Sequence, residues 1–354
     1  MAEPQIPSTQ TVAWIDTPGP NGKLVIRNGF EVEQPGKGEV LVKMECSGIC
    51  HSDCRNVEGM GKYTDIPGHE GIGTVVSLGP SVDSSLMNKR VGIKWLYSAC
   101  NNCAACRAGR INNCPYQLNT GRSTRGTLQQ YFLAAADFVT MIPEGLASEI
   151  AAPLLCAGLS LAGAVGLCEP EVKKGEWVVI IGAGGGLGHI GVQIAARVKG
   201  YKVIAIDSGK DKEELCKEMG AEAFVDYAKD DVINKVKELT DGEGAHAVIC
   251  VAGSEKAYEQ APSLVRNLGV VVCVGLPPDT FMFPMSPIQI ANRGLIIKGS
   301  STGTSAQMDE LLQFALEKKI TPKIDVYEFN ESPQIIQRLL KYEVTGRKVV
   351  KAPV

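Results

Sequence analysis

The sequence lacks an excess of positive charge. Its 36 Lys and Arg residues are outnumbered by 39 Asp and Glu residues, and the formal net charge is -3. Such a chain has no basic field to attract nucleic acid or an anionic lipid surface. We therefore expect neither nucleic acid nor a membrane among its partners.

The first ten residues also lack the cationic segment and the apolar run of a secretory signal. Two long uncharged windows, 150–168 and 177–196, have the length of membrane spans. The first contains a proline and alternating small residues and the second is rich in glycine, so buried core is the better interpretation. We expect a cytoplasmic protein, in which the 12 cysteines stay reduced and serve as metal ligands or core.

The length of 354 residues favours two domains, and 44% apolar with 21% charged residues is typical of a globular protein. Repeats and low-complexity linkers are absent. Short strand patterns separated by Gly and Pro occupy the first 150 residues or so, which predicts a small, partly open β-barrel. These strands are predicted at 11–15, 24–26, 39–45, 71–78 and 90–96.

From residue 177 onward, continuous apolar strands alternate with helical patterns. Such alternation predicts a parallel sheet covered on both faces, and hence an α/β fold class. The predicted strands are 177–181, 202–207, 223–225, 247–251 and 270–274, and the predicted helices are 215–219, 232–239, 257–268 and a last one near 308–318.

Four cysteines lie within fifteen positions, at Cys100, Cys103, Cys106 and Cys114. Their C-x₂-C-x₂-C-x₇-C spacing can close around one tetrahedral Zn²⁺ without an open position. A disulfide cluster is disfavoured by the expected compartment, and a redox pair by the lack of a thioredoxin-like context. The zinc would stabilise a loop that has little apolar sequence of its own.

A second zinc site is indicated by Cys50 and His69, because thiolate and neutral imidazole are preferred zinc ligands. A catalytic zinc has three protein ligands and an open position, and Cys156 is the best candidate for the third. Burial of an isolated Cys and His is the simple alternative. A rival knuckle of Cys46, Cys50, His51 and Cys54 is conceivable, although burial suits the thiols of Cys46 and Cys54 better.

A glycine-rich turn follows the strand at 177–181 and precedes a helical pattern. Gly186, Gly188 and Gly191 match G-x-G-x-x-G literally, but Gly191 would lie well inside the helix. The better match to the motif takes Gly185 and Gly188 as its second and third glycines. Gly182 then lies one residue before the usual position of the first glycine, and Gly186 and Leu187 lie within the turn. Such a turn brings backbone N–H groups to a pyrophosphate.

The next strand ends at Asp207, a position where a carboxylate binds both ribose hydroxyls of NAD and repels the 2′-phosphate of NADP. Lys212, five residues on, could help to hold the ribose. A solvated helix lysine is an equally good interpretation.

Together with Gly346-Arg347, these motifs resemble the zinc-dependent medium-chain alcohol dehydrogenases, and most closely their tetrameric microbial branch. The resemblance implies a GroES-like β-rich catalytic domain over 1–160 and 303–354, with a zinc lobe at 98–116, and a Rossmann NAD-binding domain over 161–302. It implies two zinc ions and NAD as cofactors, a primary or secondary alcohol, aldehyde or ketone as substrate, and a homotetramer or homodimer.

The resemblance also implies roles for single residues. The catalytic zinc would bind Cys50, His69 and Cys156, with Glu70 close by and Asp53 orienting His69. Ser52 would carry the substrate proton, and Trp95 would line the substrate pocket. His51 and Arg347 would contact the pyrophosphate of the cofactor, and Asp207 and Lys212 would hold its ribose.

One position departs from the family pattern. Arg55 stands where the proton relay often ends in a histidine, and a guanidinium cannot act as a general base. We expect the proton to leave through ribose and water. The loop 55–65 also lacks tryptophan and has Met60 and Tyr63 instead, which favours a wider pocket for larger or secondary alcohols.

Three other functions are compatible with parts of this pattern. A specialised aldehyde or ketone reductase of a biosynthetic pathway would use the same zinc site. A non-catalytic cofactor-binding relative and a zinc-free quinone-type reductase are both disfavoured, because Cys50, His69 and Cys156 are all present.

Overall fold

The computed structural model describes residues 6–61 and 64–353. The chain divides into two compact units: unit 1 is Met1–Cys156, Met308–Leu316 and Pro322–Val354, and unit 2 is Ala157–Gln307 and Glu317–Thr321. Tyr63, which the sequence analysis places in the substrate loop, lies outside the described residues.

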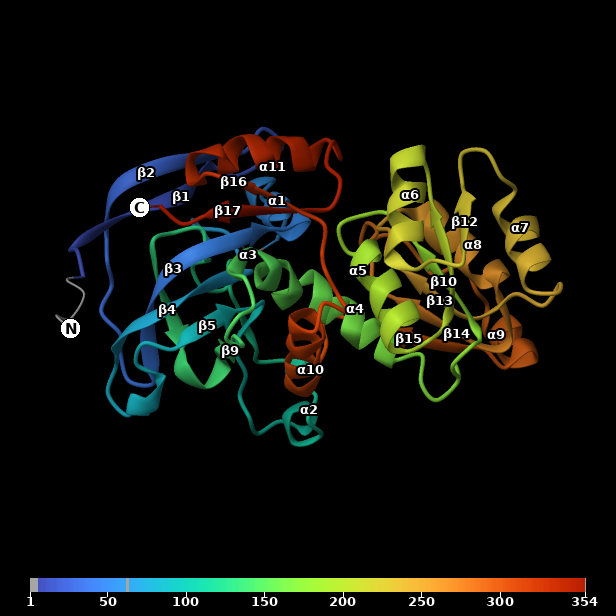
Figure 1. The fold of residues 1–354 in the computed structure, drawn as a ribbon, viewed down its shortest axis with the longest axis horizontal. Coiled ribbons are helices and arrows are strands. Elements are labelled where there is room, and N and C mark those ends of the chain that lie inside the picture. Colours follow the sequence, from blue (N-terminus) through green and yellow to red (C-terminus); the bar gives the residue numbers. More distant parts are fainter. Residues whose placement is uncertain (1–5, 62–63, 354) are drawn as a thin grey trace. The chain divides into compact units, whose positions relative to one another are not determined.

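Unit 1 is built on a seven-stranded sheet of order β16-β17-β3-β4-β5-β9, with β8 paired to β3 (Figure 1). All of its pairings are antiparallel except that of β16 with β17. A two-stranded ribbon, β1-β2, and a short pair, β6-β7, complete the strands. Alternating apolar residues of the large sheet, such as Val40, Val42 and Val75, form a core cluster with Phe132.

The elements of unit 1 are β1 (Thr9–Thr17), β2 (Lys23–Glu31), β3 (Glu39–Ile49), α1 (His51–Val57), β4 (Gly71–Leu78), β5 (Arg90–Ile93), β6 (Leu96–Ser98), α2 (Ala104–Arg107), β7 (Leu118–Asn119), β8 (Tyr131–Ala135), β9 (Thr140–Met141), α3 (Ser148–Ala151), β16 (Ile324–Tyr327), α11 (Ser332–Leu340) and β17 (Arg347–Lys351). Helix α10 (Ser305–Leu316) begins in the residues of unit 2 and ends in those of unit 1.

Unit 2 is a six-stranded parallel sheet of order β12-β11-β10-β13-β14-β15 (Figure 1). Numbered along the chain this is the order 3-2-1-4-5-6 of dinucleotide-binding sheets. Helix α5 packs on β10 and contacts α4 and α6, whereas α8 packs on β13 and β14 and contacts α7. The two sets of helices cover the sheet on both faces, so the predicted α/β fold class is confirmed.

The elements of unit 2 are α4 (Ala157–Gly166), β10 (Trp177–Ile181), α5 (Gly188–Gln193), β11 (Lys202–Asp207), α6 (Lys210–Met219), β12 (Ala223–Asp226), α7 (Val232–Leu239), β13 (Ala245–Cys250), α8 (Glu255–Leu264), β14 (Val265–Cys273), α9 (Pro287–Arg293) and β15 (Ile296–Gly299). The strands are largely apolar in their middle because both faces of the sheet are buried, and Val179, Ile204 and Val248 have no exposed surface.

The predicted helix over 257–268 is wrong in its last turn. Helix α8 ends at Leu264 and the chain enters β14 at Val265. Pro262 donates no backbone hydrogen bond in that turn, and the guanidinium of Arg293 donates to the carbonyl oxygens of Pro262 and Val265. Carbonyls that would continue the helix are therefore satisfied by a side chain from a distant element.

Within 6–61 and 64–353, no single helix is long and apolar enough to cross a membrane; by length and composition alone, the bent pair Ser148–Leu155 and Ala157–Gly166 meets that test.

Candidate functional site

Four potential metal ligands of unit 1 meet although they are far apart in the sequence. The ligand atoms of Cys50, His69, Glu70 and Cys156 all lie within 4.8 Å of one another. Cys50 follows β3, His69 and Glu70 directly precede β4, and Cys156 follows a short 3₁₀ helix over Ala152–Leu155. Strands β3 and β4 are hydrogen-bonded neighbours, so the end of one brings Cys50 to the start of the other.

Asp53 holds the imidazole of His69 in one orientation. Its Oδ2 accepts a hydrogen bond from the N–H of Cys50 at 2.8 Å, and its Oδ1 accepts one from the N–H of Gly68 at 2.9 Å. The same Oδ1 lies 3.2 Å from Nδ1 of His69. Nε2 of His69 is buried and has no hydrogen-bond partner among the residues that the structure describes. Burying a polar nitrogen without a partner costs folding free energy. The arrangement suits a metal ligand, because a metal ion would bind Nε2 while a carboxylate holds the other ring nitrogen.

The separation of the two sulfur atoms fits one zinc ion. Sγ of Cys50 lies 3.9 Å from Sγ of Cys156. Two thiolates bound to one tetrahedral Zn²⁺ at about 2.3 Å would be about 3.8 Å apart. A disulfide would require about 2.05 Å. The hydrogen bond between the two thiols lowers the pKa of Cys50 and raises that of Cys156, so one thiolate is favoured before any metal binds.

A buried ion pair adjoins this cluster. The guanidinium of Arg347 donates to Oε1 of Glu70, and the two side chains are only 5% and 0% exposed. Burial raises the pKa of Glu70 to about 7, against the opposing effect of Arg347. Arg347 was predicted to contact the cofactor. In the structure its guanidinium is paired with Glu70, a carboxylate of the metal cluster.

Gly48 has a role in this cluster that the sequence analysis missed. A Cβ at Gly48 would lie 2.1 Å from Oε2 of Glu70, so only glycine leaves room for the carboxylate. This demand comes from a residue 22 positions away in the chain, and no local sequence signal carries it.

The other residues predicted for the catalytic site lie as follows. The hydroxyl of Ser52 is 3.8 Å from Sγ of Cys50, and the ring of Trp95 meets that of His69 edge-on with centroids 5.1 Å apart. The ring of His51 stacks on that of Tyr342 at 4.9 Å. Ser52 and Trp95 therefore border the metal cluster, while His51, at the first position of α1, is held by a partner that the sequence analysis did not name.

The lobe cysteines form a second cluster. The Sγ–Sγ distances are 3.5 Å for Cys103–Cys106, 3.6 Å for Cys100–Cys114, and 3.9 Å for both Cys100–Cys106 and Cys103–Cys114. The edges of a tetrahedral tetrathiolate zinc site are about 3.8 Å. Backbone N–H groups, that of Asn102 foremost, lower the pKa of Cys100 to about 6, which favours its thiolate. None of the four residues of α2, all of them described, is buried, so the lobe lacks an apolar core here.

The rival knuckle is not assembled. The thiol of Cys54 donates to the carbonyl of Ile336 at 3.8 Å, and burial raises the pKa of Cys54 and of Cys46. Among the described residues, neither Cys46 nor Cys54 belongs to the cluster of metal-ligating side chains that contains Cys50. All 12 cysteines lie within the described chain and none is in a disulfide.

The glycine-rich turn of unit 2 lies between β10 and α5. Gly182 has a φ of +85°, and its N–H donates to the carbonyl of Ile206 at 2.8 Å, which ties the turn to β11. A Cβ at Gly188 would lie 2.1 Å from the carbonyl oxygen of Gly182, so the helix can start this close to the strand only with glycine. Gly185, Gly186 and Leu187 lie between them, and α5 continues as a π-helical segment over Ile194–Val198.

Asp207 lies at the end of β11, where its carboxylate connects three segments. It accepts hydrogen bonds from the N–H of Gly184 at 2.9 Å and of Ser208 at 2.9 Å, and from Nζ of Lys212 at 2.7 Å. Its side chain is only 5% exposed. Gly184 was not among the predicted residues, yet a Cβ there would lie 2.6 Å from Cβ of Lys212. The middle of the turn is therefore glycine because α6 approaches it.

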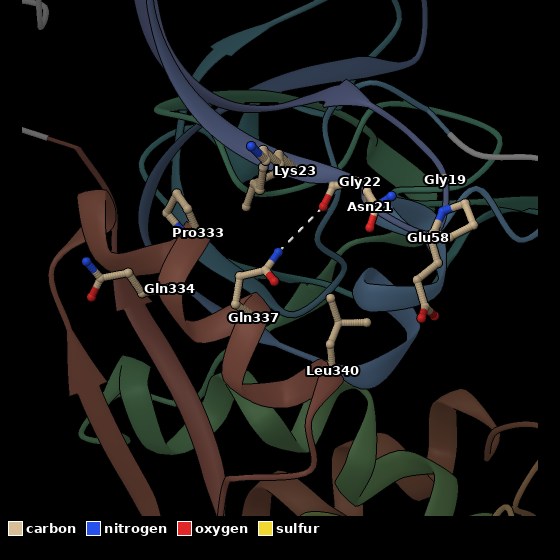
Figure 2. A pocket seen from close by; sticks show the side chains of 11 residues that line it. Gly19, Asn21, Gly22, Lys23, Glu58, Pro333, Gln334, Gln337 and Leu340 are labelled. Atoms are coloured by element: carbon tan, nitrogen blue, oxygen red, sulfur yellow. Dashed lines mark hydrogen bonds between the residues drawn. The ribbon is translucent and has the colours of Figure 1, made fainter.

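Unit 1 also contains a cavity of about 400 Å³ apart from the metal clusters (Figure 2). The cavity is lined by the turn between β1 and β2, by Glu58 just after α1, and by residues of α11 from Pro333 to Leu340. Figure 2 shows the amide of Gln337 directed to the carbonyl of Gly22. None of the predicted metal or nucleotide residues lines this cavity.

Comparison with known proteins identifies relatives of both parts of the chain. Residues 36–144 match the alcohol dehydrogenase GroES-like domain, and residues 186–317 match the zinc-binding dehydrogenase domain. The predicted combination of a GroES-like and a Rossmann domain is thereby confirmed.

Three relatives cover nearly the whole chain. It is 40% identical to an alcohol dehydrogenase of Geobacillus stearothermophilus, covering 91% of this chain and 95% of the relative. It is 39% identical to alcohol dehydrogenase 2 of Emericella nidulans, covering 99% of both. The solved structure of acetophenone reductase from Geotrichum candidum in complex with NAD superimposes with a TM-score of 0.84 at 26% identity, covering 98% of each chain.

Proposed function

From the premise that this chain belongs to the zinc-dependent medium-chain alcohol dehydrogenases, we propose that it transfers a hydride reversibly between a primary or secondary alcohol and NAD. One observation carries this proposal: Cys50, His69 and Cys156 converge, with a buried Nε2 of His69 that is unpartnered in the described residues. These three residues would hold a zinc ion, which would supply a Lewis acid for the substrate oxygen, and bound NAD would supply the hydride acceptor.

The side chains around the zinc ligands have separate tasks. Asp53 positions His69 through Nδ1. The hydroxyl of Ser52, next to Cys50, accepts a hydrogen bond from the alcohol and passes the proton to water. Trp95 forms an apolar wall beside His69. Glu70, paired with Arg347, keeps a second carboxylate next to the ligands.

In unit 2, the turn from Gly182 to Gly188 is proposed to receive the pyrophosphate. Asp207 and Lys212 are proposed to bind the ribose, and their 2.7 Å contact supports that assignment.

A substrate screen tests the proposed function. The zinc-loaded enzyme is incubated with NAD and primary, secondary and aromatic alcohols, and NADH is followed by absorbance while metal content is measured by elemental analysis. We expect NADH formation with at least one class and two zinc ions per chain. No turnover in either direction across the panel, with both zinc sites filled, would contradict the proposal.

Arg55 allows a prediction about the route of the proton. Arg55 lies three residues after Ser52 on α1, so the two share one face of the helix. A histidine titrates near pH 6.5, whereas arginine stays protonated. We expect Arg55→His to raise kcat for alcohol oxidation near pH 7 by roughly tenfold, below the full range for a general base because water already provides a path.

The measurement for Arg55→His is a pH profile of kcat. The rise should be largest above the pKa of the new histidine and small below it. Arg55→Gln serves as the control, since it removes the charge without adding a base. Equal rates and equal profiles for all three proteins would refute the role of this position.

Asp207 allows a prediction about the cofactor. Replacing Asp207 with alanine removes a carboxylate that repels the 2′-phosphate of NADP and frees the ammonium of Lys212. The carboxylate and a 2′-phosphate would be about 5 Å apart, at an effective dielectric of about 20. Removing their repulsion is therefore expected to raise the ratio of kcat/KM for NADP to that for NAD by roughly a hundredfold. An unchanged ratio in steady-state assays would contradict the assignment of Asp207 to the ribose.

We also propose a homotetramer or homodimer. Strand β15 is at one edge of its sheet, where backbone groups can pair with a second copy. The segment before it exposes large apolar side chains: Leu276 is 72%, Met282 81% and Ile288 67% exposed. Light scattering coupled to size exclusion tests this proposal, and a monomer at micromolar concentration would refute it.

The cytoplasm is the proposed location. Both clusters contain thiols, which must be reduced to bind zinc, and a reducing compartment keeps them reduced.

A further inference from the structure

Strand β12 carries a second buried carboxylate beside that of Asp207. The two strands β11 and β12 are parallel neighbours, and Asp226 is the register partner of Asp207. Neighbouring strands are about 4.8 Å apart, so the two acids end their strands side by side. Asp226 is only 8% exposed, although it is charged and lies at the end of the last strand in its sheet.

Asp226 is bound to the turn that leads into α6. Its Oδ2 accepts a hydrogen bond from the N–H of Gly209 at 3.5 Å, and the hydroxyl of Ser208 donates to it as well. Gly209, with a φ of +101°, is the residue from which α6 begins. Hydrogen bonds, that of Ser208 foremost, hold the pKa of Asp226 below its usual value, so the group stays ionised at working pH.

Each of the two acids also holds one lysine. Nζ of Lys212 lies 2.7 Å from Oδ1 of Asp207, and Nζ of Lys229 lies 3.1 Å from Oδ2 of Asp226. An ammonium group is a good partner for a phosphate. While both lysines are paired with carboxylates, neither is free to bind an added phosphate, and two negative charges remain at the strand ends. Lys229 lies in the turn after β12, is 75% exposed, and can reorient once its ion pair with Asp226 is removed.

We propose that Asp226 is a second determinant of the preference for NAD over NADP, because it adds a negative charge beside Asp207 and keeps Lys229 from a 2′-phosphate. This inference rests on the proposed function, in which Asp207 binds the ribose. Asp226 thereby contributes to discrimination between a hydroxyl and a phosphate at the adenosine 2′ position. Through Ser208 and Gly209, Asp226 is also a positioning residue for Asp207.

The test is Asp226→Asn in the full-length, zinc-loaded enzyme. Asparagine keeps an acceptor oxygen for Ser208 and Gly209 but removes the charge. Binding of adenosine 2′,5′-bisphosphate and of 5′-AMP is measured by calorimetry on the same preparation. We expect the affinity of the bisphosphate relative to that of 5′-AMP to rise about tenfold, and further in the double variant with Asp207→Asn. Because each ratio comes from one sample, a partly unfolded fraction cancels.

Two matched variants separate charge from position. Glu222→Gln removes the same charge at the opposite end of β12, where Glu222 is exposed, and should leave the ratio within twofold of that of the unaltered enzyme. Adding Lys229→Met to Asp226→Asn should remove most of the gain, since the released ammonium is then absent. An unchanged ratio in Asp226→Asn, or an equal rise in Glu222→Gln, would overturn the proposal.

The result also distinguishes this inference from the proposed function. If the unaltered enzyme oxidises alcohols with NAD while Asp226→Asn leaves the ratio unchanged, only the role of Asp226 fails. If the unaltered enzyme binds neither 5′-AMP nor NAD, the proposed function itself fails.

Discussion

Replacing Cys156 with serine should remove one zinc ion per chain and lower kcat/KM for alcohol oxidation by at least about a thousandfold. A Lewis acid at the substrate oxygen stabilises the transition state by several kcal/mol, and each 1.36 kcal/mol is tenfold in rate. Sγ of Cys156 is 3.9 Å from that of Cys50, and a serine hydroxyl is a far weaker zinc ligand than a thiolate. Elemental analysis and steady-state kinetics measure the two effects.

Cys216→Ser is the matched control for this experiment. Cys216 is a fully buried thiol of α6 that belongs to neither metal cluster. The control should retain two zinc ions and the greater part of the activity, at some cost in stability. Retention of both zinc ions and of the rate in Cys156→Ser would show that the third ligand is a different residue.

The second large effect is expected in the zinc lobe, where the loss of zinc should lower thermal stability rather than activity. Cys106→Ser should also remove one zinc ion per chain, yet leave the initial rate per remaining catalytic zinc within a few-fold of that of the unaltered enzyme. The lobe lacks buried residues in α2, so binding of the ion accounts for its folding. We expect the apparent unfolding midpoint to fall by on the order of 10 °C and thermal inactivation to accelerate.

The pair of variants makes the two zinc sites distinguishable. Thermal scans and inactivation half-lives are compared with zinc content, using Cys156→Ser as the counterpart, which should lose activity with little loss of thermal stability. If Cys106→Ser abolished the initial rate while the catalytic zinc stayed bound, the lobe would have a part in catalysis that its structure does not suggest.

Several features of the fold follow from short stretches of sequence. The strands Trp177–Ile181 and Lys202–Asp207 and the helix Val232–Leu239 have the predicted bounds, because continuous apolar runs and helical periodicity are local signals. The lobe cysteines are similar: a spacing of two to seven residues suffices to bring their sulfur atoms within 3.5–3.9 Å.

Other features depend on residues that meet only after folding. Arg293 reaches across from α9 and ends α8 earlier than its periodicity indicates. Gly48 and Gly184 must be glycine because Glu70 and Lys212 pack against them. Neither neighbour is predictable from the glycine itself, since packing distances between distant segments are not encoded in local patterns.

By itself, the sequence determined the α/β class, the strand–turn–helix frame that ends in Asp207, and the identity of the thiols and imidazole that can bind zinc. Periodicity and ligand chemistry depend on residues that are close together in the sequence, so the sequence alone is enough to predict these features. Only the tertiary structure decided that Cys156 stands beside Cys50 and His69, that Arg347 is paired with Glu70, and that Asp226 adjoins Asp207. These residues belong to separate segments of the chain, and the packing of strands and turns brings them together.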